Sequence, residues 1–203
     1  MKRFGKVVLT FGFLLLVLAG CTNNMETPTS KVEEFLGKYQ NLDSDVTTQL
    51  DQVLEDEDTM TDEQKKEYRS LLEKQYQNLS YKINNEDVDG DSATVDVEIE
   101  VLDYASTIQD AKKYYDEHKD EIEEEYQKDK EDNDNVVEDA VDGAENAVKE
   151  SAAYIDYKIK ELKSATDTVN YDITFHLLKE DGEWKIQDIS DADLEKIHGL
   201  YEG

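Results

Sequence analysis

Side chains that commonly act as nucleophiles or general bases are scarce in this sequence. Among its 203 residues, the histidines and the single cysteine are His118, His176, His198 and Cys21. The apolar pattern predicts that each histidine lies on a solvent face or at a helix edge, and the sequence contains no glycine-rich phosphate loop, Gly-x-Ser-x-Gly or His-x-x-x-His motif. A pocket on a sheet could still use Tyr171 or Tyr81 beside an aspartate for acid–base work. With that alternative left open, we predict no catalytic residue, no enzyme activity and no cofactor.

A polar segment near the middle of the chain begins like a calcium-binding loop. Three oxygen-bearing side chains at alternate positions, Asn85, Asp87 and Asp89, precede Gly90. The similarity then ends, because the twelfth position holds Asp96 instead of Glu and the segment joins two expected strands rather than two helices. Asn, Asp and Gly are favoured in turns for conformational reasons alone. We therefore predict a polar turn over residues 84–92 and no metal site.

The densest acidic section has four glutamates within five residues: Glu121, Glu123, Glu124 and Glu125. Such a run is ordinarily a solvated face. A surface of one sign also attracts an oppositely charged partner, with a benefit that falls as the salt concentration rises. We retain these four residues as a candidate docking surface for a cationic peptide or protein.

The whole chain is strongly acidic. Its 51 Asp and Glu outnumber its 22 Lys and Arg, which gives a formal charge of −29. Nucleic-acid binding needs clustered Lys and Arg that replace the counterions of the phosphates, so this balance excludes nucleic acid as a partner. The length fits one domain of ordinary size.

The amino terminus has the pattern of an export signal. Residues 1–6 carry three cations, and residues 7–18 form an apolar run interrupted only by Thr10 and Gly12. A membrane-spanning helix needs about 20 apolar residues, so a shorter run behind a basic head is typical of a secretory signal. The run ends in four residues that bear on processing: Leu18, Ala19, Gly20 and Cys21.

This ending resembles the lipobox of bacterial lipoproteins. The resemblance implies that residues 1–20 are a signal peptide, with Ala19 and Gly20 as the small residues beside the cleaved bond, and that the sulfur of Cys21 carries diacylglycerol. Two acyl chains anchor a protein stably, so residues 21–30 would be a lipidated tether on the extracytoplasmic face of the cell membrane. A plain signal peptide, or a buried helix with an incidental cysteine, is the alternative. The use of 20 Lys against two Arg is similar to that of AT-rich Gram-positive bacteria.

Helical periodicity dominates the chain before residue 80. Apolar residues three and four apart predict a first helix over about residues 29–42 and a second around residues 46–54. Thr61 and Gln64 have the spacing of a capping box, which predicts that a third helix begins there.

A period of two then marks two pairs of strands. Apolar and polar side chains alternate over residues 81–83 and 95–101, and again over residues 169–177. A turn at residues 180–182 leads to the apolar positions of residues 184–186. We predict four antiparallel strands whose apolar face is covered by the early helices.

Residues 106–165, between the two strand pairs, have a helical pattern. Ser106 and Gln109 again have capping-box spacing, and apolar residues recur in steps of three and four over residues 137–162. We predict a helical-hairpin insertion here. Two helices packing on their own sheet is the simpler interpretation, while a sparse seam of Ala and Val also suits pairing with a partner.

Together these elements predict an α+β fold, in which a four-stranded antiparallel sheet packs on helices in one domain over residues 31–203. A final helix over residues 191–201, capped by Ser190 or Asp191, would close it. The Asp-Gly-Glu-Trp-Lys-Ile hairpin within residues 171–189 is similar to the final strands of exported lipoproteins of the nuclear transport factor 2-like, cystatin-like superfamily. That superfamily has both enzymes and binding-only members, so the resemblance implies a fold without a function.

Three functions are consistent with these observations. The first is a non-catalytic cell-surface lipoprotein that binds an extracellular protein or a cationic peptide, which accounts for the anchor, the charge and the missing catalytic set. The second is a small-ligand carrier or enzyme that uses a pocket on the sheet. The third is an envelope structural protein that self-associates through the helical insertion. We prefer the first.

Overall fold

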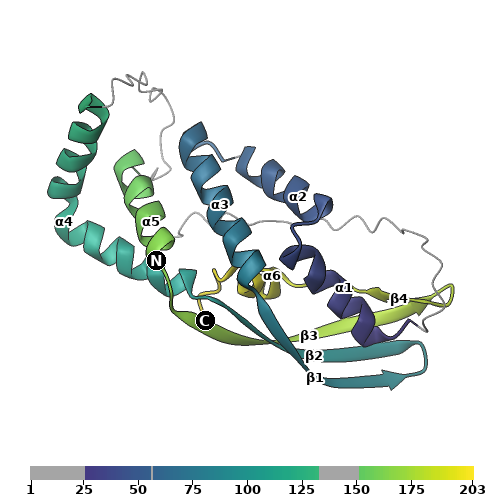
Figure 1. Cartoon of the computed structure of the whole chain (residues 1–203). Coiled ribbons are helices and arrows are strands. Elements are labelled where there is room, and N and C mark those ends of the chain that lie inside the picture. Colours follow the sequence, from purple (N-terminus) through teal and green to yellow (C-terminus); the bar gives the residue numbers. More distant parts are fainter. Residues whose placement is uncertain (1–25, 56, 133–150) are drawn as a thin grey trace.

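The computed structural model describes residues 26–55, 57–132 and 151–203. The first three helices are α1 (Pro28–Gln40), α2 (Ser44–Glu55) and α3 (Asp62–Asn78). The hairpin of β1 (Ser80–Asp89) and β2 (Ser92–Leu102) follows, and then α4 (Tyr104–Asp132) and α5 (Ala152–Ser164). The last elements are β3 (Thr168–Glu180), β4 (Glu183–Ile186) and α6 (Asp191–His198) (Figure 1). This arrangement confirms the predicted α+β class.

The sheet has four antiparallel strands in the order β1-β2-β3-β4, which also confirms the prediction. Alternate residues of β2 are buried, and these are apolar: Ala93, Val95, Val97, Ile99 and Val101. β3 adds apolar residues to the same face, because Val95 pairs with buried Phe175 in the ladder. The period of two therefore determines which face of the sheet lies against the helices.

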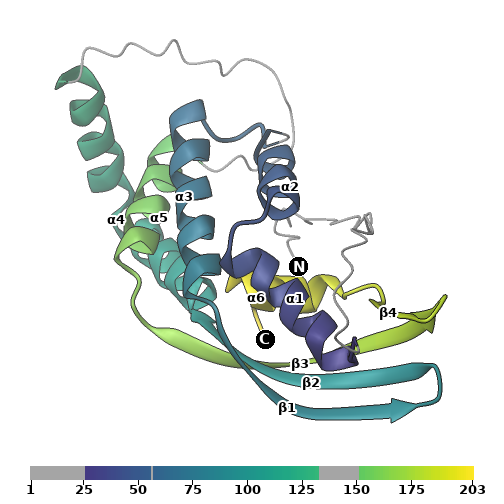
Figure 2. The ribbon, with the colours of Figure 1, turned by 45° about the vertical axis from the view of Figure 1, so that its right-hand side comes forward.

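Helices α1, α3 and α6 cover that apolar face (Figures 1 and 2). Phe35 of α1 packs edge-to-face on Phe175 of β3, with ring centroids 5.6 Å apart. Tyr39 of α1 packs in the same way on Tyr76 of α3, at 5.1 Å. Such aromatic pairs stabilise a core beyond the area that they bury. The inner face of the sheet is thus filled by side chains of the early helices, as predicted.

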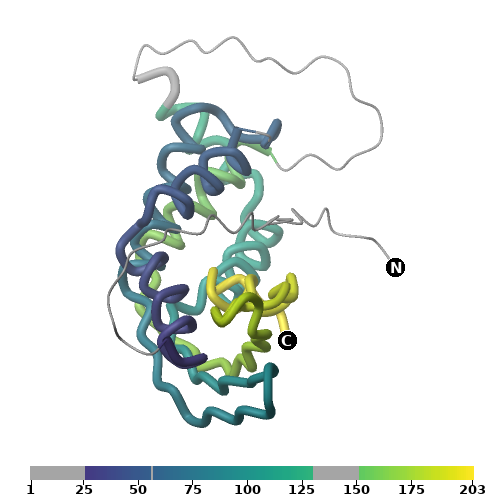
Figure 3. The backbone as a smooth tube through the Cα atoms, turned by 90° about the vertical axis from the view of Figure 1, so that its right-hand side faces the viewer, coloured from purple at the N-terminus to yellow at the C-terminus, as the bar shows by residue number. Residues whose placement is uncertain are grey.

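Helices α4 and α5 lie at the end of the molecule away from the β1–β2 turn (Figure 3). A second apolar cluster joins α5 to α3 and to the start of α4: Leu71, Tyr104, Ile155, Ile159 and Leu162. The second helical series, predicted over residues 137–162, falls partly outside the described residues. Its described part is α5, which begins with Ser151 as its N-cap.

The predicted polar turn over residues 84–92 is wrong. β1 continues to Asp89, and only Gly90, with a φ of 63°, and Asp91 form the turn. Strand pairing uses backbone groups, so polar residues pair as well as apolar ones in an exposed edge strand, and acidic side chains there discourage edge-to-edge aggregation. The alternating oxygen ligands that resemble a calcium loop therefore lie along a strand instead of around a bend.

The capping predictions are confirmed at α3 and wrong at α4. Gln64 N–H donates to Thr61 Oγ1 over 3.2 Å, and Thr61 N–H donates to Gln64 Oε1 over 2.9 Å. α4 begins at Tyr104, ahead of the predicted Ser106 cap, and Ser106 N–H donates to Asp103 Oδ1 over 3.0 Å. Tyr104 is 1 % exposed, so its burial requires the chain to enter the helix directly after β2.

His198 is buried, so its predicted position at an exposed helix edge is wrong. It is 2 % exposed near the end of α6, whose N-cap is the predicted Ser190. Its Nδ1 lies 3.0 Å from Tyr76 Oη. Burial lowers the pKa of His198 to about 4, so the imidazole is neutral at pH 7. The sequence held a signal for this, because His198 lies four residues after Leu194 and shares its stripe.

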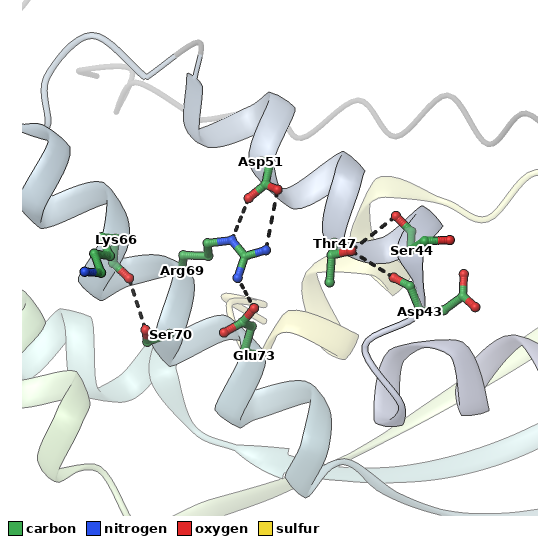
Figure 4. Close-up of polar contacts among 8 residues, drawn as sticks. All are labelled: Asp43, Ser44, Thr47, Asp51, Lys66, Arg69, Ser70 and Glu73. Carbon is green, nitrogen blue, oxygen red and sulfur yellow. Dashed lines mark hydrogen bonds and ion pairs between the residues drawn. The ribbon is translucent and has the colours of Figure 1, made fainter.

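Arg69 of α3 joins α2 to α3 (Figure 4). Its Nε lies 2.5 Å from Asp51 Oδ1 of α2, and its Nη1 pairs with Glu73 one turn along α3. The Arg69 side chain is 31 % exposed, so solvent weakens both ion pairs. A guanidinium held between two carboxylates is nevertheless more favourable than a single exposed pair.

Arg69→Ala is expected to lower the free energy of unfolding by about 1 kcal/mol, because both ion pairs are lost. Urea denaturation at low salt measures the change, and about 1 M NaCl should reduce it by screening. Lys66→Ala is the matched control, since Lys66 is an exposed cation of the same helix and contributes only its backbone carbonyl to the contacts in Figure 4. Equal losses in the two variants would contradict a contribution from these ion pairs.

Candidate functional site

The structure bears on one of the two predicted groups of site residues. The lipobox and lipidation residues lie outside the described residues: Leu18, Ala19, Gly20 and Cys21. The four glutamates of the predicted docking surface lie on α4. The positions of these four glutamates on α4, and the helices that surround them, therefore test the predicted docking surface.

Three of the four glutamates, Glu121, Glu124 and Glu125, share one face of α4 at i, i+3 and i+4, whereas Glu123 projects from the opposite face, because successive helical residues turn by about 100° around the axis. Glu123 Oε1 accepts a hydrogen bond from Tyr115 Oη over 2.5 Å. Glu124 pairs with a lysine one turn along α4, and Glu121 is exposed. Glu125 lines a groove between α3, α4 and α5. The structure therefore brings only one of the four predicted residues, Glu125, into a concave site.

This α3–α4–α5 groove has a volume of about 490 Å³. α5 stands between α3 and the last turns of α4, so the three helices form its walls (Figure 2). Its apolar lining comes from α4 and α5: Ile122, Tyr126, Ala153, Tyr157 and Ile159. On α4, the lining residues recur at positions i, i+3, i+4 and i+7 from Ile122, which places them on one face of the helix.

Carboxylates outnumber cations in the groove. The acidic lining residues are Glu63, Glu67, Glu125, Asp129 and Asp156, and the basic ones are Lys160 and Lys163. Lys163 Nζ of α5 is already 2.7 Å from Glu67 Oε1 of α3. The remaining excess of negative charge beside an apolar floor suits a ligand that carries both cations and apolar groups.

Gln64 holds α3 against α5 at this groove. Its side chain is 3 % exposed, and its Nε2 donates to Asp156 Oδ1 over 2.5 Å and to Ala152 O over 3.1 Å. Losing the partners of a buried amide costs about 1–3 kcal/mol, so these contacts fix the spacing of the two helices. The sequence pattern predicts Gln64 only as a capping residue. Its partners lie 88 and 92 residues away, where no local pattern reveals them.

Comparison with known proteins assigns no family to this chain. No family model, no curated protein and no solved structure matches it. The geometry and charge of the groove are therefore the basis for a functional proposal. In the part of the chain that the structure describes, no helix is both long enough and apolar enough to cross a membrane.

A second hollow, of about 320 Å³, lies on the outer face of the sheet near the β1–β2 turn. Asp87, Thr94 and His176 are cross-strand neighbours there. Among residues 26–55, 57–132 and 151–203, no group of three or more His, Cys, Asp or Glu is placed to hold a metal ion. The α3–α4–α5 groove is the larger and the more charged of these two sites, so it is the stronger candidate for binding.

The two tyrosines considered for acid–base work lie on the inner face of the sheet. Tyr81 and Tyr171 flank Ile99 in the strand ladder. Burial raises the pKa of both phenols, so they are protonated at pH 7. Tyr171 Oη donates to Tyr201 O over 3.3 Å. Neither tyrosine lines the α3–α4–α5 groove.

Proposed function

We propose that the protein is a lipid-anchored binding module on the extracytoplasmic face of the cell membrane. Its domain binds a cationic segment of an extracellular protein or peptide and does not catalyse a reaction. The observation that carries this proposal is the α3–α4–α5 groove, in which five carboxylates and two ammonium groups surround an apolar floor. Amphipathic peptides bind proteins by placing their apolar side in such a groove, with charges at its edge.

The charge of the whole chain supports a cationic partner. A formal charge of −29 repels anions and draws cations toward the surface over about a Debye length, which is ~8 Å at physiological salt. This long-range attraction raises the rate of encounter, while contacts in the groove determine which segment stays bound. Binding should therefore depend both on salt and on the individual glutamates of the groove.

The anchor supports an extracellular partner. A diacylglycerol group on Cys21 would place the domain outside the cell, and α1 begins soon after, at Pro28. Anionic lipid would repel the acidic domain and keep it directed outward. We further propose that residues 106–165 form one helical-hairpin insertion, which supplies α4 and α5 as two of the three groove walls. The fold would then be an elaborated form of the nuclear transport factor 2-like lipoprotein domain.

The test is binding of a lysine- and leucine-rich helical peptide to the protein. Replacing Glu63→Gln together with Glu125→Gln is expected to raise the Kd about tenfold at low salt, since losing two attractive contacts costs about 1.4 kcal/mol. Isothermal titration calorimetry or fluorescence anisotropy measures the change. Both glutamates line the groove and are exposed at its edge, so the substitutions leave the core intact.

The matched control is Glu117→Gln with Glu121→Gln, two exposed positions of α4 that do not line the groove. It removes the same net charge and should change the Kd less than twofold. Equal weakening in both double variants would show that only the overall charge matters. If the unaltered protein binds no cationic peptide at any salt concentration, the proposed function is wrong.

A further inference from the structure

Helix α4 is broken at His118, which has a φ of −124° and a ψ of 24° inside the helical span. The bend separates a proximal half, residues 104–117, from a distal half, residues 119–132 (Figure 1). In an unbroken helix the carbonyl of Tyr114 would accept from the N–H of residue 118. Here the His118 ring places Nδ1 3.0 Å from that carbonyl oxygen. A side chain that enters the hydrogen-bond ladder in this way is a known cause of kinks.

The proximal half is fixed to α5 on the side where the break occurs. The His118 ring stacks on Tyr114, with centroids 4.0 Å apart and planes 13° apart. Tyr114 in turn stacks on Tyr157 of α5, at 5.7 Å and 19°. These three stacked rings therefore fix the end of the proximal half, just before the bend, against α5.

The distal half supplies the outer wall of the α3–α4–α5 groove. All four of the α4 residues that line the groove follow the break: Ile122, Glu125, Tyr126 and Asp129. The opposite walls, α3 and α5, are joined to each other by the Gln64 contacts and by the Lys163–Glu67 ion pair. Rotation of the distal half about His118 would therefore change the width of the groove without moving α3 from α5.

One hydroxyl group links this wall to both the proximal half and α5. Tyr115 is 6 % exposed, and its Oη donates to Glu123 Oε1 of the distal half over 2.5 Å. The same Oη lies 2.7 Å from Ser151 Oγ, which also accepts from Tyr154 N–H at the start of α5. Tyr115 Oη donates its only proton to Glu123, so it accepts one from Ser151. The hydroxyl thus connects the proximal half, the distal half and α5.

We propose that the distal half of α4 is a hinged wall, which pivots at His118 and is latched by Tyr115 to admit the ligand of the groove. This inference rests on the proposed function for the identity of that ligand, a cationic amphipathic segment. A helix with side chains is about 10–12 Å wide and rises ~5.4 Å per turn, so one turn occupies roughly 400–600 Å³. The groove, at about 490 Å³, holds one such turn when it is latched. A pivot that widens the groove makes room for more of such a segment.

The test measures wall position in the full chain without any peptide. Two spin labels are attached to cysteines in a Cys21→Ala background, at Lys66 of α3 and Gln127 of the distal half, and their separation is measured by electron–electron resonance. A second pair, at Lys66 and Lys113, reports the proximal half. All three labelled positions are exposed. Gln127 is roughly 14 Å along the helix from His118, so a 20° pivot moves it by about 5 Å.

Tyr115→Phe removes only the latching hydroxyl. It is expected to lengthen the mean 66–127 distance by about 5 Å, or to broaden the distribution of that distance by as much. The 66–113 distance should stay unchanged. Tyr114→Phe is the matched control, because it removes a neighbouring hydroxyl from the same helix and keeps the ring stack; it should change neither distance. If Tyr115→Phe does not fold, Glu123→Ala breaks the same latch from the other half.

An unchanged 66–127 distance in the latch variant would overturn the hinge. So would an equal shift of both distances, because α4 would then move as one body. A loss of thermal stability without a distance change would show that Tyr115 is structural only. Since no peptide is present, each of these results concerns the hinge alone, and failure of the groove to bind cationic peptides would be detected separately.

Discussion

Gly199→Ala is expected to lower the free energy of unfolding by about 3 kcal/mol. Gly199 ends α6 in the left-handed region, with φ 70° and ψ 21°. A side chain in that conformation costs about 1–2 kcal/mol by itself. An added Cβ would also overlap Gln75 Nε2 and Leu102 O.

The overlap is costly because the Gln75 amide and the backbone of Leu102 are already hydrogen-bonded to each other. Gln75 is fully buried, and its amide donates to Leu102 O over 2.9 Å and accepts from Leu102 N–H over 3.0 Å. Displacing that amide separates a fully buried side chain from its partners, the half-buried backbone groups of Leu102, at about 1–3 kcal/mol. Gly199 O also accepts from Ala105 N–H over 2.8 Å, in the first turn of α4. The contacts among Gln75, Leu102 and Gly199 therefore connect α3, β2 and α6 beside the first turn of α4, the helix that supplies the outer wall of the groove.

Gly90→Ala is the matched control for this substitution. Gly90 has a φ of 63°, close to that of Gly199, but an added Cβ there meets no atom within 4 Å. It should therefore cost only the conformational term, about 1 kcal/mol. Urea or thermal denaturation of the two variants separates the two contributions. Similar losses at both positions would mean that backbone conformation, and not the buried amide, determines the cost at Gly199.

The elements that were predictable from the sequence are those whose pattern is local. The alternation from Ala93 to Val101 predicted both a strand and its buried face, because neighbouring residues of a strand point to opposite sides. Thr61 and Gln64 predicted the start of α3, since a capping box involves residues only three apart. At this level the α+β class, the four strands and the covering helices all followed from periodicity.

Predictions failed where strand pairing or burial outweighed local propensity. Asn and Asp residues that favour turns extend β1 to Asp89, because an edge strand needs backbone pairing and no apolar face. α4 begins at Tyr104 rather than at Ser106, since the buried phenol ring must reach the α3–α5 cluster. These outcomes depend on which segments meet in space, and a short window of sequence does not contain that information.

The candidate site was predictable only in part for the same reason. The acidic run suggested one docking surface of four glutamates, but helical geometry turns Glu123 away from the other three, and only Glu125 lines the groove. The stripe of Ile122, Glu125 and Tyr126 was visible as i, i+3 and i+4 spacing. The walls opposite it were not, because the contact of Gln64 with Asp156 spans 92 residues.

The stability of the protein is expected to depend on pH through His198, by about 2 kcal/mol between pH 7 and pH 5. Burial lowers the pKa of this imidazole from 6.5 to about 4. Between these two values the unfolded chain binds a proton that the folded chain does not, so folding loses stability as the pH falls through this window. The contribution is complete above pH 6.5 and is reduced by about 3 kcal/mol at pH 4.

Other groups change the absolute stability over the same range, so the expected effect is a difference between proteins. Protonating carboxylates relieves the self-repulsion of an acidic chain and opposes the loss from His198. His198→Gln keeps a hydrogen-bonding partner for Tyr76 Oη but has no titrating group. The free energy of unfolding of the native protein, minus that of this variant, should therefore decrease by about 2 kcal/mol from pH 7 to pH 5.

Denaturant titrations at several pH values measure that difference. His176→Gln is the matched control, since it removes an exposed imidazole from the outer face of β3. A difference for His198→Gln that does not fall between pH 7 and pH 5 would contradict the prediction, because the folded imidazole would then bind a proton as readily as the unfolded one. The imidazole ring lies against the rings of Tyr39 and Tyr76, at 6.4 and 5.5 Å between centroids. Burial against two uncharged phenols is therefore the physical reason to expect a neutral His198 and a fold that weakens in mild acid.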